Sequence, residues 1–115
     1  MEVFKQLKNL GYKHYIDLTI EELDALPINN IEKRIEYSLV IDWFRKKYHY
    51  DIHITFKHTD TYKVEGINSV YYDIEIYHLL GGDAFKIYKF SGISDDYHIA
   101  REEGILKAIK LINEK

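Results

Sequence analysis

The segment Asn29–Tyr48, NNIEKRIEYSLVIDWFRKKY, constrains the fold most, because it is the longest uninterrupted helix signal in the chain. Apolar residues recur in it at helical spacing, and others widen the apolar surface beyond the ~100° stripe typical of a core-facing helix. The stripe is Ile31, Ile35, Leu39 and Trp43, and the widening residues are Tyr37, Val40, Ile41, Phe44 and Tyr48. A helix with this much apolar surface must pack against a large partner element.

Local signals mark where helices begin and end. Asn29, with Glu32 three residues later, predicts the start of the long helix, because both side chains can pair with free backbone N–H groups. Two short helices are expected before it, Glu2–Leu10 and Ile20–Leu26. The second has Thr19 and Glu22 as a capping box, and Pro27 stops it. We therefore expect a short helical segment over 1–28 ahead of an α+β domain over 29–115, within one globular unit.

After Tyr48 the hydrophobic period changes to two, which is typical of strands with one buried face. Strands are expected from about Ile52 to Phe56, over Ser69–His78 and over Ala84–Phe90, with a further short strand at Tyr62–Glu65. Turns are expected at residues 58–61, 66–69 and 81–83. A last helix, Tyr97–Asn113, follows Asp95 and Asp96, either of which can cap it.

This order predicts an α+β fold, a two-layer sandwich in which two long helices cover one face of an antiparallel meander of three to four strands. The last helix carries small residues at helical spacing, Ala100, Gly104 and Ala108, which allow it to lie close to the sheet. The other face of the sheet is left to solvent or to a partner.

Composition excludes several classes of protein. The 115 residues carry a net charge of −3 and no cysteine, so a disulfide framework, a thiolate zinc site and a cysteine nucleophile are ruled out. The N-terminus lacks the pattern of a signal peptide, and no apolar run approaches the ~20 residues that span a bilayer. The expected location is therefore cytoplasmic, without membrane contact. The scattered basic residues also argue against a general nucleic-acid binder.

The predicted open face of the sheet is rich in tyrosine and charge, a composition that suits protein contacts. If Ile52, Ile74 and Ile87 face the helices, the candidate binding residues on the other face are His53, Lys57, Tyr71, Asp73, Glu75, Tyr77, Lys86 and Tyr88, beside Asp51 and Thr55. Such a face can bind a protein or a second copy of the chain. The simpler interpretation is that cross-strand pairs stabilise a solvated sheet.

No residue set in the sequence indicates catalysis, a metal or a cofactor. The serines lie outside a nucleophile elbow, and the acidic pair Asp73 and Glu75 is expected to be exposed, where paired carboxylates do not separate their pKa values. The histidines lack the close spacing and partner carboxylate of a metal site. Gly81-Gly82-Asp83 lacks the lysine of a phosphate loop. We therefore expect a protein that is not an enzyme and that holds no cofactor.

The order of helix, three strands and helix resembles the double-stranded-RNA-binding domain. Those domains carry a lysine cluster at the start of the last helix, where this chain has Asp95-Asp96-Tyr97-His98. The resemblance implies a nucleic-acid-binding alternative in which Tyr71, Tyr77 and Tyr88 stack on bases, while Lys57 and Lys86 lie near phosphates.

Two further stretches, WFRKKY at 43–48 and DDYHIAREEGILKAIKLI at 95–112, resemble a group of small proteins encoded by phages and mobile elements of Bacteroidetes-type bacteria. The similarity covers roughly residues 39–50 and 95–114. The group has no assigned activity, so it implies a context and no mechanism. Together with the open face, it leads us to expect an accessory protein that binds another protein or itself, and that occludes a surface of a host protein.

Overall fold

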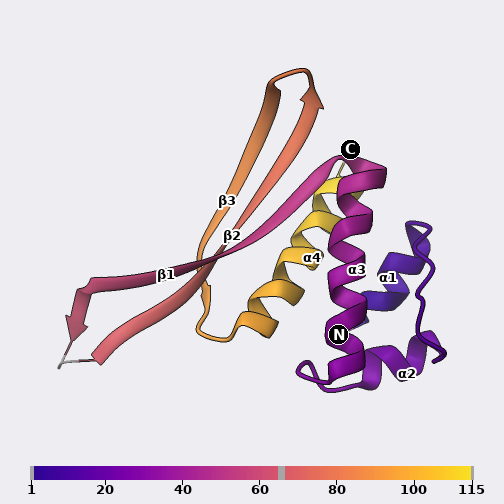
Figure 1. Cartoon of the computed structure of the whole chain (residues 1–115), viewed down its shortest axis with the longest axis horizontal. Helices are drawn as coiled ribbons and strands as arrows, with labels where there is room; N and C mark the ends of the chain where they lie inside the picture. Colours follow the sequence, from indigo (N-terminus) through magenta and orange to yellow (C-terminus); the bar gives the residue numbers. More distant parts are fainter. Residues whose placement is uncertain (1, 65–66, 115) are drawn as a thin grey trace.

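The computed structural model describes residues 2–64 and 67–114, with the backbone alone for 58–64 and 67–70. Four helices and three strands follow one another along the described chain (Figure 1). They are α1 (Val3–Asn9), α2 (Ile20–Ala25), α3 (Ile31–Tyr48), β1 (Tyr50–Val64), β2 (Ile67–Gly81), β3 (Ala84–Ser94) and α4 (Tyr97–Asn113). The predicted α+β class and order of elements are confirmed.

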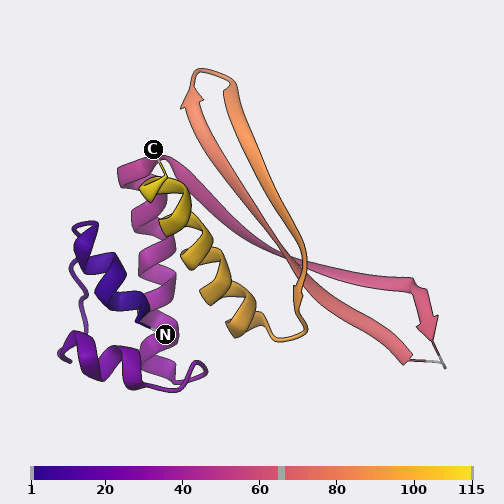
Figure 2. The same cartoon turned by 180° about the vertical axis from the view of Figure 1, so that it is seen from behind.

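The strands form one antiparallel sheet in the order β1-β2-β3, and both long helices lie on the same side of it (Figures 1 and 2). Helices α1 and α2 pack on the side of α3 that is remote from the sheet. The two hairpins, β1–β2 and β2–β3, extend beyond the helices in different directions. The sheet is therefore covered near its middle, and its two hairpin ends project into solvent.

Helix α4 lies close to the sheet through Gly104, as the small-residue stripe predicted. A Cβ atom on Gly104 would meet Cγ2 of Ile52 at 3.1 Å and Cδ1 of Ile54 at 3.2 Å. The buried neighbours of Gly104 on the same face of α4 are Ala100, Ile105, Ala108 and Ile109. A larger side chain at position 104 would therefore push the helix away from β1.

The long helix turns a different face to the core than its regular stripe predicted. Tyr37, Val40 and Phe44 are fully buried, whereas Ile31 and Ile35 are well exposed. Of the stripe itself, Trp43 packs against the core, and the buried face is formed mainly by the residues that widen it. The helix has apolar residues on more than one face, and the sheet, α4 and the N-terminal segment together cover only part of them.

The helix starts follow the expected chemistry, with one shift. The capping box of Thr19 and Glu22 is present, and Asp96 caps α4 by accepting from the backbone N–H groups of residues 98 and 99. The cap of α3 is Asn30, which accepts from the N–H groups of residues 32 and 33, so the assignment to Asn29 was wrong by one residue. Asn29 and Asn30 carry the same side chain, so the sequence alone does not show which of them caps the helix. Asn30 has the extended backbone that a cap requires.

Two buried charged residues of α3 hold the N-terminal segment. Glu36, fully buried, accepts hydrogen bonds from the Tyr12 hydroxyl at 2.5 Å and from the backbone N–H groups of Tyr15 and Ile16 at 2.5 and 2.8 Å. Lys33 donates to the backbone carbonyl groups of residues 24 and 26 at the end of α2, at 3.3 and 3.0 Å. Burial and the contact with Glu36 raise the pKa of Tyr12. The residues before α3 therefore share the core of the sheet domain.

The strands are longer than predicted. Residues 58–61, expected as a turn, and the short strand expected from Tyr62 belong to one continuous β1, which ends at Val64. Residues 67–69 of the second expected turn belong to β2, and Gly66 lies outside the described residues. Strand β3 continues past Phe90 to Ser94, through Gly92 with a φ of 62°. A run of polar residues in a hairpin is compatible with either a turn or a strand, so the sequence pattern does not distinguish them.

We expect Gly104→Val to lower the free energy of unfolding by roughly 1–3 kcal/mol, because the added methyl groups overpack the contact with Ile52 and Ile54. Urea denaturation measures the change. The matched control is Lys110→Val, which puts the same residue on the exposed side of α4 and should cost only the few tenths of a kcal/mol of helix propensity. Equal midpoints for the two variants would contradict the close approach.

Glu36→Leu should lower the free energy of unfolding by about 3 kcal/mol, because it leaves the buried Tyr12 hydroxyl and two partly buried backbone N–H groups without their acceptor. The local measurement is amide hydrogen exchange at Tyr15 and Ile16, which should lose protection. Glu32→Leu, an exposed position in the first turn of α3, serves as the control. Unchanged protection at Tyr15 and Ile16 in Glu36→Leu would show that the carboxylate does not hold this loop.

Candidate functional site

The strand register places six of the eight predicted binding residues together on the face of the sheet remote from the helices. Ile52 pairs with Ile76, and Ile54 with Ile74; of these, Ile52, Ile74 and Ile76 are buried. Side chains alternate along strands, so the residues between them point to the other face. These are His53, Lys57, Tyr71, Asp73, Glu75 and Tyr77, and the same parity adds Asp51 and Thr55. We call this surface the open face.

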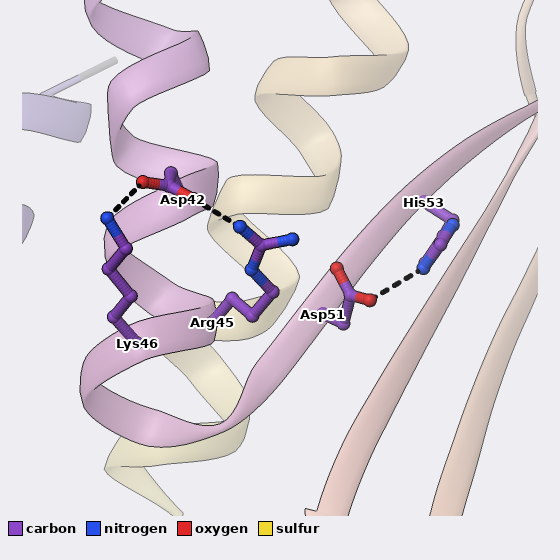
Figure 3. A network of polar contacts seen from close by, with 5 residues as sticks. All are labelled: Asp42, Arg45, Lys46, Asp51 and His53. Atoms are coloured by element: carbon purple, nitrogen blue, oxygen red, sulfur yellow. Dashed lines mark hydrogen bonds and ion pairs between the residues drawn. The ribbon is translucent and has the colours of Figure 1, made fainter.

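The charged residues of the open face contact one another. Nε2 of His53 lies 3.0 Å from Oδ2 of Asp51, and both side chains project from β1 (Figure 3). The Tyr77 hydroxyl donates to Oε2 of Glu75 at 2.6 Å, and its ring meets the ring of His53 edge-on at 5.0 Å. Asp73 accepts from the backbone N–H of Gly92 at 2.9 Å. Much of the predicted site is thus an internally paired network across the three strands.

The electrostatics of this network are balanced. The hydrogen bond from Tyr77 holds the pKa of Glu75 below its usual value, and the positive charges of Lys89, Lys57 and His53 act in the same direction. The same contact raises the pKa of Tyr77. Carboxylates therefore neutralise the cations of the open face, so this face does not carry the continuous basic charge of a phosphate-binding surface.

The prediction that Lys86 and Tyr88 share this face was wrong. Tyr88 pairs with Ile76 and packs against the core, and the Lys86 ammonium group lies 5.0 Å from the centroid of its ring. Ile87, which was expected to face the helices, pairs with Tyr77 on the open face. The physical cause is a register irregularity between Leu79 and the turn. A shift of one residue transfers every following side chain to the opposite face.

This shift brings an apolar group to the end of the open face. Leu79 pairs with Phe85, and Tyr77 pairs with Ile87, so the four side chains are neighbours on one side of the β2–β3 hairpin. Phe85 is 53% exposed, and its ring lies 5.9 Å from that of Tyr77. We call Tyr77, Leu79, Phe85 and Ile87 the hairpin patch. The sequence analysis found only Tyr77, because both faces of β3 carry large apolar residues and the pattern does not reveal the bulge.

Hollows lined by described residues include ones of about 290, 210 and 230 Å³, below the 300–1,000 Å³ typical of ligand pockets. Within residues 2–64 and 67–114, no group of three histidine, aspartate or glutamate side chains is placed to hold a metal ion. In the same described ranges, none of the helices has the length and apolar character needed to cross a bilayer.

Comparison with protein-family models, curated proteins and solved structures found no match to this chain.

Removing the Tyr77 hydroxyl should raise the pKa of Glu75 toward its ordinary value, because that hydrogen bond is the main cause of its depression. The measurement is a carboxyl ¹³C titration of Tyr77→Phe by NMR. Asp42 of α3 is the internal reference, since its pKa is held down by Lys46 and Arg45 on the same helix (Figure 3). It should titrate alike in both proteins. An unchanged Glu75 titration would refute the contact.

Proposed function

We propose that this protein acts by binding another protein through the hairpin patch, without catalysis. The observation that supports the proposal is the position of Leu79, Phe85 and Ile87, side by side and substantially exposed on a hairpin that projects beyond the helices. Contiguous apolar groups of this kind on a folded protein are typical of interaction sites. Tyr77 at their border adds an aromatic ring, a residue type enriched at the centres of interfaces.

The energy available from such a contact is substantial. Full burial of a large apolar side chain contributes roughly 1.5–3 kcal/mol, so the three exposed residues together can supply the central part of an interface. The paired charges of His53, Asp51 and Glu75 lie along the same face and can form its polar rim. Because they already have partners, we expect them to affect specificity more than affinity.

The biological setting is part of the same proposal. The resemblance of residues 39–50 and 95–114 to small proteins of phages and mobile elements supports an accessory role in the bacterial cytoplasm. In this setting the projecting hairpin would occlude a surface of a host protein. A second copy of the chain is the alternative occupant of the patch, and sedimentation equilibrium distinguishes the two.

Nucleic-acid binding is the competing hypothesis. Its proposed contacts are weakened by the fold, since Tyr77 is bonded to Glu75 and Tyr88 packs on the helix side of the sheet. Balanced charge on the open face gives few phosphate contacts. Binding of this kind would decline steeply with salt.

Ile87→Gln should abolish or strongly reduce retention of a protein partner, because it places an amide in the middle of the patch. The measurement is affinity capture from a nuclease-treated bacterial lysate at 50 and 300 mM salt, followed by mass spectrometry. The matched control is Lys86→Gln, which introduces the same residue on the opposite face of the same strand. We expect the control to retain the partner at both salt concentrations.

Three outcomes would contradict the proposal. Equal retention by the Ile87 and Lys86 variants would place the interface elsewhere. Loss of all bound material after nuclease would favour nucleic acid. A wild-type protein that captures nothing and is dimeric by sedimentation, with Ile87→Gln monomeric, would assign the patch to self-association.

A further inference from the structure

Three charged side chains are buried among the described residues, and one of them lacks the partners that the other two have. They are Lys33, Glu36 and Arg101. Lys33 and Glu36 hydrogen-bond to the N-terminal segment. Arg101 of α4 is 5% exposed, and its Nη1 donates to the Ser38 hydroxyl at 3.2 Å. Its Nε and Nη2 are buried without a hydrogen-bond partner. Buried donors without an acceptor are costly, so they require an explanation.

The two unpaired donors have a useful geometry. Nε–H and one Nη–H group lie side by side on one edge of a guanidinium group, at the spacing of the two oxygens of a carboxylate. The guanidinium group lies over two aromatic rings, with its Cζ 5.4 Å from the ring centroid of Tyr97 and 5.7 Å from that of Tyr37. These cation–π contacts hold the group in place, and its Nε and Nη2 atoms have no hydrogen-bond partner among the described residues.

The surroundings of Arg101 are positive. Arg34 of α3 is exposed and makes no ion pair among the described residues, and Arg101 makes none there either. Burial lowers the pKa of His98, and Arg34 and Arg101 lower it further, against the smaller opposing effect of Asp96. The imidazole Nδ1 of His98 is also buried and without a hydrogen-bond partner. Two cations and a neutral histidine thus lie together without a compensating anion bound to them.

A hollow of about 210 Å³ connects this cluster to the exposed apolar stripe of α3. Its lining is Ile31, Arg34, Ile35, Ser38 and Arg101. Ile31 is 67% and Ile35 is 53% exposed, so the lining combines an exposed apolar surface with two cations, Arg34 and Arg101. Such a volume suits one carboxylate with one apolar side chain, and it is small for a nucleotide or a cofactor.

We propose that this hollow binds a carboxylate of a protein segment, paired with Arg101 and Arg34, whose neighbouring apolar side chain lies on Ile31 and Ile35. The two arginines favour an anion by charge complementarity. The exposed side chains of Ile31 and Ile35 favour a carboxylate next to an apolar side chain of a peptide rather than a free inorganic anion. The site lies at the end of the molecule opposite to the hairpin patch and does not depend on it (Figure 1). Because the Nε and Nη2 edge of Arg101 is buried, carboxylate binding requires the exposed ring of Tyr97, which lies beside the guanidinium group, to change rotamer.

The test is an NMR titration of ¹⁵N-labelled full chain, observing the Arg101 Nε–H signal and the pKa of His98. N-acetyl-leucine supplies a terminal carboxylate, and N-acetyl-Leu-Glu-amide supplies a side-chain carboxylate. N-acetyl-leucinamide is the uncharged control, and inorganic phosphate tests for a general anion site. We expect saturable shifts with a dissociation constant of about 1–10 mM for the preferred acid, as suits a fragment of this size. The pKa of His98 should rise on binding, because the anion offsets the two arginines.

The variant Arg34→Gln should weaken binding roughly five- to tenfold without changing the fold, because Arg34 is exposed. Arg45→Gln is the matched control on the same helix, since Arg45 is paired with Asp42, and it should bind as wild type does. Arg101→Lys keeps the charge and removes the two-donor edge, so it should lose most of the affinity if it folds. The tighter of the two acids identifies a chain terminus or an acidic side chain as the source.

Several results would overturn the proposal. They are the absence of a saturable shift, equal shifts with N-acetyl-leucinamide, tighter binding of phosphate than of either acid, or identical affinities of Arg34→Gln and Arg45→Gln. The first would mean that internal water alone satisfies the Arg101 donors. None of these outcomes bears on the hairpin patch, so the two proposals fail independently.

Discussion

The buried carboxylate of Glu36 is the contact on which the arrangement around α3 depends. It accepts three hydrogen bonds from residues 12–16, so it fixes the N-terminal segment against one side of the long helix. Removing any buried acceptor of this kind leaves donors unpaired at a cost of about 1–3 kcal/mol each. Because Glu36 and Lys33 hold this segment beside Tyr37, the neighbouring stripe of Ile31 and Ile35 stays uncovered. These two polar anchors therefore determine which apolar surface of α3 stays exposed.

On the other side of α3, the packing of α4 against the sheet depends on the absence of a side chain at Gly104. Gly104 allows α4 to lie on Ile52 and Ile54, and this contact leaves the hairpins without helical cover beyond the middle of the sheet. An antiparallel sheet tolerates this, since one of its faces can remain solvated. The charges on the open face then require partners of their own, and Asp51 with His53 and Glu75 with Tyr77 provide them.

The predictable part of this fold rests on strong local patterns. Each of three patterns predicts one structure: the capping box at Thr19, the alternation around Ile52 and Ile74, and the small residue at position 104. The predictions were wrong where two local structures satisfy the same sequence pattern. A bulge near Leu79 reverses the faces of β3, and large apolar side chains on both faces of that strand satisfy either register. Similarly, apolar residues around most of α3 do not reveal which face the core occupies.

Arg101 shows why a candidate site can remain hidden in a sequence. It lies between small and apolar residues at helical spacing, and a charged residue there is the only local signal of a buried cation. Whether such a cation is structural depends on partners that are distant in sequence: Ser38 is 63 residues away, and Arg34 adds charge where an acid would be expected. Cation–π contacts with Tyr37 and Tyr97 stabilise the guanidinium group while its Nε and Nη2 donors stay without a partner. A protein that buries an arginine in this way retains the hydrogen-bonding capacity that recognition of a carboxylate requires.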